Sequence, residues 1–220
     1  MSLAASRAYG SADSNPSDYA GSIGYDFRKV RGKVLLGDFN ARFGQGLVLW
    51  NGAFINSLST PSAFMKKPSG LSRSWSYTGG AALTGAAAEV GVEGFTVSAV
   101  LAAPGVKDAA RRPDKVRLMP AANIAWLCRH GQVSVTHMAE ISGFRANDEV
   151  QTRIPVMKTS ADAAFCVRGV NIYGEAAYDW VERNVDVLAG TDFKAGEDVR
   201  LAALCRYFPD ELYGAAFSGA

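Results

Sequence analysis

Charged and polar residues recur at every second position in several stretches of this chain and supply most of its candidate chemistry. Side chains on a β-strand point to alternate faces, so residues two apart share one face. Charges taken out of water must be paired or hydrated, so we expect this polar face to be lined by ion pairs or to form a path for an ion or ligand. The predicted lining residues are Asp38, Asn40, Arg42, Asp162, Arg168, Glu175, Asp179, Asp186, Asp192, Lys194, Arg200 and Arg206.

The positions of the histidines do not indicate a catalytic site in which histidine acts as a general base. The chain has two histidines. His130 lies in an expected tight turn, and His137 lies in an expected strand whose Ser134 and Thr136 point to the other face. A general base must reach its nucleophile at hydrogen-bond distance, and no local pattern arranges this. We therefore expect no catalytic residue and no enzyme activity. The weaker alternative is a lipid hydrolase, of the kind that some β-barrels of bacterial outer membranes form.

The glycines and cysteines do not form a recognisable cofactor or metal site. The stretch from Phe43 to Gly46 reads FGQG and lacks the Gly-Lys-Ser/Thr ending of a phosphate-binding loop. We expect these glycines to mark a kink or bulge in a curved strand, or close packing against a bulky neighbour. The chain has 3 cysteines, at Cys128, Cys166 and Cys205, without the paired spacing of a zinc site. We expect no cofactor and no bound metal.

The length of the alternating runs predicts where such strands could reside. Four consecutive runs between Lys158 and Phe208 alternate polar and apolar residues and are joined by very short turns. Each run has about 9–11 residues, which is the length a tilted strand needs to cross a bilayer. The apolar set that includes Phe165, Ile172, Val187 and Leu201 is the expected outward face.

Turn signals divide the chain into about ten strands arranged as an antiparallel up-and-down meander. Tight Gly-containing turns alternate with mostly longer connectors at Asn51–Tyr77, Pro104–Leu118, Arg145–Met157 and Val181–Asn184. Short turns at one end and long loops at the other are typical of outer-membrane barrels. The expected strands are 21–30, 33–49, 78–91, 94–103, 120–128, 132–142, 158–168, 171–180, 185–194 and 198–208.

The last hairpin contains charges that predict its register. Folding it about Gly196 places Lys194 opposite Asp198, Asp192 opposite Arg200, and Asp186 opposite Arg206. Directly opposed charges of unlike sign stabilise a strand pair by about 0.2–1 kcal/mol each. A slip by one residue would put these charges on the apolar face, so we expect the register with three opposed pairs.

Composition narrows the class of protein. The chain has 220 residues, a formal charge of +2 and 48% hydrophobic residues. This charge gives no argument for a nucleic-acid partner. No apolar stretch is long enough for a transmembrane helix.

The expected domain organisation has two parts. Residues 1–20 lack the apolar core of a signal peptide and are expected to be disordered or loop-like, whereas residues 21–220 are expected to form an incomplete barrel domain. We expect the chain to be a fragment of a longer exported protein.

Several motifs resemble a family of Bacteroidetes outer-membrane proteins that typically join a periplasmic helix-hairpin-helix domain to a β-barrel. They are KVLLGDFNARFGQGLVLW from Lys33 to Trp50, FCVRGVNIYGEAAYD from Phe165 to Asp179, and CRYFPDELYGAAF from Cys205 to Phe217. The resemblance covers most of the chain and implies a transmembrane barrel. No helix-hairpin-helix segment is present, so no DNA-related role is carried over, and the family supplies no catalytic residues.

These features together predict an all-β protein that forms all or part of a transmembrane barrel in the outer membrane of a Gram-negative bacterium. Its function is expected to be a pore, a transport component or a scaffold for an envelope complex. The expected partners are the lipid bilayer and other envelope proteins. Aromatic residues near strand ends are expected to meet the lipid headgroups, namely Trp50, Tyr178, Trp180, Phe193, Tyr207 and Phe208. The main alternative is a soluble, lipocalin-like barrel in which the apolar face lines the interior and binds a small apolar ligand.

Overall fold

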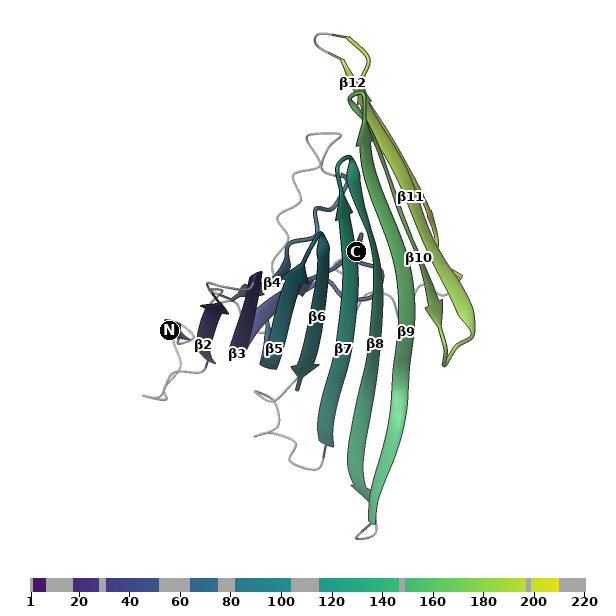
Figure 1. Ribbon diagram of the computed structural model, residues 1–220. Helices are drawn as coiled ribbons and strands as arrows, with labels where there is room; N and C mark the ends of the chain where they lie inside the picture. The colour runs from purple at the N-terminus through teal and green to yellow at the C-terminus, as the bar shows by residue number, and fades with distance from the viewer. Residues whose placement is uncertain are drawn as a thin grey trace.

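The fold is built from β-strands in a single sheet (Figure 1). The computed structural model describes residues 2–6, 18–27, 31–51, 64–74, 82–103, 115–146, 149–196 and 199–209. The strands are β1 (Ser2–Ser6), β2 (Asp18–Phe27), β3 (Arg31–Arg42), β4 (Gly70–Arg73), β5 (Leu83–Val92), β6 (Phe95–Ala102), β7 (Lys115–Cys128), β8 (Gly131–Ala146), β9 (Glu149–Val167), β10 (Val170–Asp179), β11 (Asn184–Lys194) and β12 (Arg200–Tyr207).

Consecutive strands are neighbours in an antiparallel meander. The 12-stranded sheet runs in the order β1-β2-β3-β5 to β12, and β4 pairs with the end of β3. The predicted all-β up-and-down meander is therefore confirmed. Among the described residues β1 and β12 are the two edges of an open sheet, so this part of the chain is not closed into a barrel.

One face of the sheet is buried and the other is exposed to solvent. On β10, Tyr173, Glu175 and Ala177 are buried, whereas Ile172 and Ala176 on the opposite face are exposed. We call the buried face the inner face and the other the outer face. Large apolar side chains stay exposed along the outer face of β6 to β12, among them Val97, Ile124, Val135, Ile172, Val187 and Leu201.

Part of the inner face is covered by residues 43–51 and 64–74, which we call the inserted segment. Its Leu47, Val48, Leu49 and Leu71 pack in one cluster with Phe39 and other apolar residues of the sheet. The strand expected to run to Leu49 ends at Arg42, because the chain turns back onto the sheet there. Trp50 was expected at the headgroup level, but it is buried in the inserted segment.

Strands β7, β8 and β9 are longer than the sequence predicted. They have 14, 16 and 19 residues and extend beyond the β10–β11 turn in Figure 1. The loops expected at 104–118 and 145–157 are therefore partly strand. Proline lacks a backbone N–H for a strand ladder. Pro155 is accommodated because the β8–β9 register shifts between Glu140 and Ser142, next to it.

The register of the last hairpin differs by two residues from the predicted one. Lys194 lies opposite Arg200, Asp192 opposite Ala202 and Leu188 opposite Arg206. A shift of two keeps every side chain on its predicted face, so the alternation cannot distinguish the two registers. Asp192 instead meets Arg200 diagonally, at 2.5 Å between Oδ2 and Nη2.

The N-terminal region contains more strand than was expected. β1 and the first residues of β2 fall within 1–20, the range predicted to be disordered or loop-like. In the part of the chain that the structure describes, no helix is long and apolar enough to cross a membrane.

Candidate functional site on the inner face

The structure brings most of the predicted lining residues together on the inner face of β9 to β12. Asp162, Glu175, Asp179, Asp186 and Asp192 are all buried there. Lys194, Arg200 and Arg206 share this face by register but are exposed near its edge. Arg168 was expected within this strand face, but it lies exposed in the β9–β10 turn with φ of 51°.

Asp38, Asn40 and Arg42 do not belong to this set, which corrects the prediction. The register pairs Lys33 with Glu89, Glu89 with Ser98 and Ser98 with Asn123, so the odd-numbered residues of β3 share the inner face. The even-numbered Asp38, Asn40 and Arg42 therefore point to the opposite side. They bind local partners there, and Asp38 Oδ1 accepts a hydrogen bond from Thr84 at 2.5 Å.

Glu175 is the point at which the sheet holds the inserted segment. Its Oε2 accepts hydrogen bonds from the backbone N–H groups of Gln45 and Leu47, at 2.7 and 3.0 Å. Gly44 and Gly46 on either side of Gln45 have φ of 59° and 89°. A Cβ on Gly44 would lie 2.9 Å from the Glu175 carboxylate. The predicted FGQG stretch is thus a backbone anion-binding turn of the kind known as a nest.

Lys66 stabilises the same turn from within the inserted segment. Its backbone N–H donates to Gln45 Oε1 at 3.0 Å, and its carbonyl accepts from Gln45 Nε2 at 3.1 Å. The ammonium lies 5.3 Å from the centre of the Trp50 ring, a cation–π distance. Burial and the charge of Arg206 lower the pKa of Lys66 to about 8, although the charge of Glu175 acts in the opposite direction.

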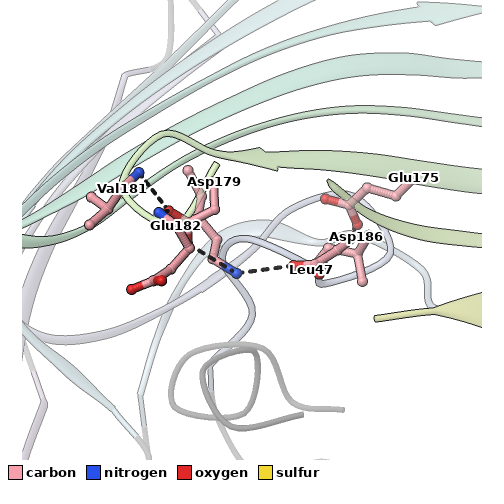
Figure 2. A network of polar contacts seen from close by, with 7 residues as sticks. Leu47, Glu175, Asp179, Val181, Glu182 and Asp186 are labelled. Atoms are coloured by element: carbon pink, nitrogen blue, oxygen red, sulfur yellow. Dashed lines mark hydrogen bonds and ion pairs between the residues drawn. The ribbon is translucent and has the colours of Figure 1, made fainter. Parts of the chain in front are cut away.

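Lys158 neutralises two acids at the far end of β10. Its Nζ lies 3.0 Å from Asp186 Oδ2 and 3.5 Å from Asp179 Oδ2. Asp179 Oδ1 also accepts hydrogen bonds from the backbone N–H groups of Val181 and Glu182, which closes the β10–β11 turn (Figure 2). Both acids are therefore bound into the structure of this end of the sheet.

Hydrogen-bonding side chains continue across the inner face toward β3. Lys33 pairs with Glu89 at 2.8 Å, and Ser98 donates to the same carboxylate. Asn123 donates to Ser134, which in turn donates to Asp162. A cavity of about 160 Å³ lies between these strands and the inserted segment, lined by residues including Gly44, Glu89, Asn123 and Ser134.

Several residues of this site were missed by reasoning from the sequence. Lys158 continues the alternation Asp162, Ser160, Lys158 on β9, so the period-two pattern could have found it. Gln45 and Lys66 could not have been found this way, because they act through a segment outside the strands. The bond between Gln45 and Glu175 joins residues 130 positions apart in the chain.

The described residues offer ion pairing and hydrogen bonding rather than an assembled nucleophile and base. His137 is exposed on the outer face and lies 2.8 Å from Thr159 Oγ1, whereas Ser134 and Thr136 are buried on the inner face. Among the described residues, no group of three or more Asp, Glu, His or Cys side chains is placed so that it could hold a metal ion.

Comparisons of the chain with protein-family models, with curated proteins and with solved structures found no match.

Proposed function

We propose that the protein is a non-enzymatic outer-membrane β-barrel protein that acts as a pore or transport component. The observation that carries this proposal is the exposure of apolar side chains on one face of the sheet while acids are buried on the other. Apolar side chains such as Ile124 and Val135 are 54% and 48% exposed on the outer face, while Asp162 and Glu175 are buried on the inner face. Lipid in place of water around the outer face removes the cost of this arrangement.

Strand length and aromatic residues support the same proposal. β10 and β11 have 10 and 11 residues, the length of a tilted strand that crosses a bilayer. Phe95 stacks on Trp126 near the short turns, and Tyr178 meets Trp180 edge to face at the opposite end. All four side chains are exposed on the outer face or at its end, where aromatic residues of membrane barrels meet the headgroups.

The inner face supports transport of a polar solute more than storage of an apolar one. Acids and their partners occupy β9 to β12, and the cavity beside the inserted segment is lined by Ser, Thr, Asn, Gln and Glu side chains together with apolar ones such as Phe43 and Leu127. A lipocalin-like barrel requires the apolar side chains on the buried face. In this protein, the inner face is apolar mainly where the inserted segment packs on it.

A scaffold for an envelope complex is the second candidate, and the length of β8 and β9 favours it. Residues 151–154 of β9 are exposed on both faces and lie beyond Lys158, the last residue of β9 that pairs with β10. Such an extension beyond the level of Trp180 offers backbone and side chains to a partner protein. It does not conflict with a polar path through the same sheet.

Membrane fractionation followed by conductance measurement tests the proposal. We expect the protein in the outer-membrane fraction, extracted only by detergent, with ion conductance after reconstitution into planar bilayers. A protein inserted in the membrane without conductance would favour the scaffold. A stable monomer purified without detergent would contradict the membrane location and favour the lipocalin-like alternative.

A further inference from the structure

Two buried acids on the inner face lie directly opposite each other. Asp162 of β9 and Glu175 of β10 are Cα partners in the register, and each is 3% exposed. Like charges at directly opposed positions destabilise a strand pair. A positive charge must therefore lie between them, or one carboxyl must carry a proton.

Each of these carboxyl groups has one oxygen committed and one without a partner. Asp162 Oδ1 accepts from Ser134, and Glu175 Oε2 accepts from the backbone of Gln45 and Leu47. Asp162 Oδ2 and Glu175 Oε1 have no hydrogen-bond partner among the described residues. Buried polar atoms are normally paired, so these two oxygens indicate a missing partner.

A third unpartnered oxygen adjoins them. Ser160 lies opposite Ala177, so it is the diagonal neighbour of Glu175 on the same face. It is 2% exposed, and its hydroxyl lies beside the Glu175 carboxylate without forming a well-aligned hydrogen bond. Three buried oxygen atoms from adjoining positions on β9 and β10 thus lack a partner.

The other acids of this face do not share this feature. Asp179 and Asp186 pair with Lys158, and Asp192 pairs with Arg200. Within the described chain no ion pair reaches Asp162 or Glu175. Lys66 is close enough for its charge to interact with Glu175, but its ammonium lies over the Trp50 ring.

We propose that Asp162, Glu175 and Ser160 bind one divalent cation of the calcium type. Hard cations of this type take oxygen ligands, and the two carboxylates supply the two negative charges that balance the ion. Water completes the coordination, because only two acidic side chains meet here. The cation links β9 to β10 and, through Glu175, stabilises the turn of the inserted segment. This inference does not depend on the membrane location.

Calcium titration of the purified protein after chelation tests this site. We expect one calcium ion to bind and to raise the unfolding temperature, and we expect Asp162→Asn to lower the affinity at least tenfold. Asp186→Asn is the matched control, because it removes the same charge from an acid that Lys158 already neutralises. Its affinity for calcium should stay within about twofold of that of the unchanged protein.

Terbium luminescence gives a readout that does not require a change in stability. Tyr173 is buried on the inner face two positions from Glu175, so it can sensitise a terbium ion at the site. We expect a signal that calcium displaces and that Ser160→Ala weakens, even if Asp162→Asn fails to fold. Absence of calcium binding, or equal calcium affinity of the Asp162→Asn and Asp186→Asn proteins, would overturn the proposal. A proton shared between Asp162 and Glu175 would then be what relieves the repulsion between the two carboxyl groups.

Discussion

At the scale of single residues, Glu175 connects two parts of the chain that are far apart in sequence. Its carboxylate is held by two backbone N–H groups whose geometry depends on Gly44 and Gly46. Hydrogen bonds to a charged acceptor contribute about 1.5–3 kcal/mol, more than bonds between neutral groups. The inserted segment is therefore fixed by a few specific atoms as well as by its apolar packing.

Substitution of Gly44 by alanine should destabilise the protein. The added Cβ meets the Glu175 carboxylate at 2.9 Å, and the residue must keep a φ of 59°. The left-handed conformation alone costs about 1–2 kcal/mol for a residue with a side chain. Gly169→Ala is the matched control, because its φ is 82° but no atom lies within 4 Å of the added Cβ. We expect urea unfolding to give a larger loss for Gly44→Ala, and equal losses would argue against the contact with Glu175.

Lys66 should make stability depend on pH in the alkaline range. Its pKa is lowered from 10.5 to about 8, so the unfolded chain binds more protons between these values. The free energy of unfolding should therefore rise from about pH 8 toward pH 10.5. Lys66→Met should flatten this rise.

The neighbouring Lys67 provides the control for this measurement because its side chain is exposed. Lys67→Met should retain the pH dependence of the unchanged protein. Urea midpoints measured at pH 7.5 and 9.5 compare the three proteins. A rise that persists in the Lys66→Met protein would show that another group causes it.

At the scale of the strands, period-two alternation predicted the faces but not the ends or the registers. It placed Glu175, Asp179, Asp186 and Asp192 correctly on one face, since alternation is a local property of a strand. The hairpin register depends on the length of the turn, which alternation does not determine. The error on Asp38, Asn40 and Arg42 has a similar origin, because relating β3 to β10 requires the register of every intervening pair.

A cross-strand disulfide tests the observed register of the last hairpin. Cys205 lies opposite Ala189 and not opposite Val187, the partner that the charge-based register requires. In a chain with Cys128→Ser and Cys166→Ser, we expect Ala189→Cys to form a disulfide with Cys205 under mild oxidation. Directly paired strand residues have Cα separations that a disulfide can bridge. Faster bridging by Val187→Cys would instead support the charge-based register.

At the scale of the whole molecule, the sheet has exposed apolar side chains on its outer face, whereas its inner face carries the buried acids beside an apolar cluster. The sequence indicated this through the length of the alternating runs, although the same alternation fits a soluble barrel with the opposite face inward. Burial shows which face is covered, because the inserted segment packs on the face that carries the acids. No local pattern predicts this packing, since it joins residues 43–51 to strands more than a hundred residues away.

The measurement that tests this arrangement most directly compares two adjacent alanines of β12. Ala203 is exposed on the outer face, whereas Ala202 lies on the inner face and is partly buried. Each is replaced by cysteine in a protein without its natural cysteines, labelled with an environment-sensitive fluorophore and reconstituted into lipid vesicles. We predict that nitroxide groups on the acyl chains quench the label at position 203 strongly and the label at 202 weakly. Equal quenching at both positions, or stronger quenching at 202, would contradict the proposed contact of the outer face with lipid.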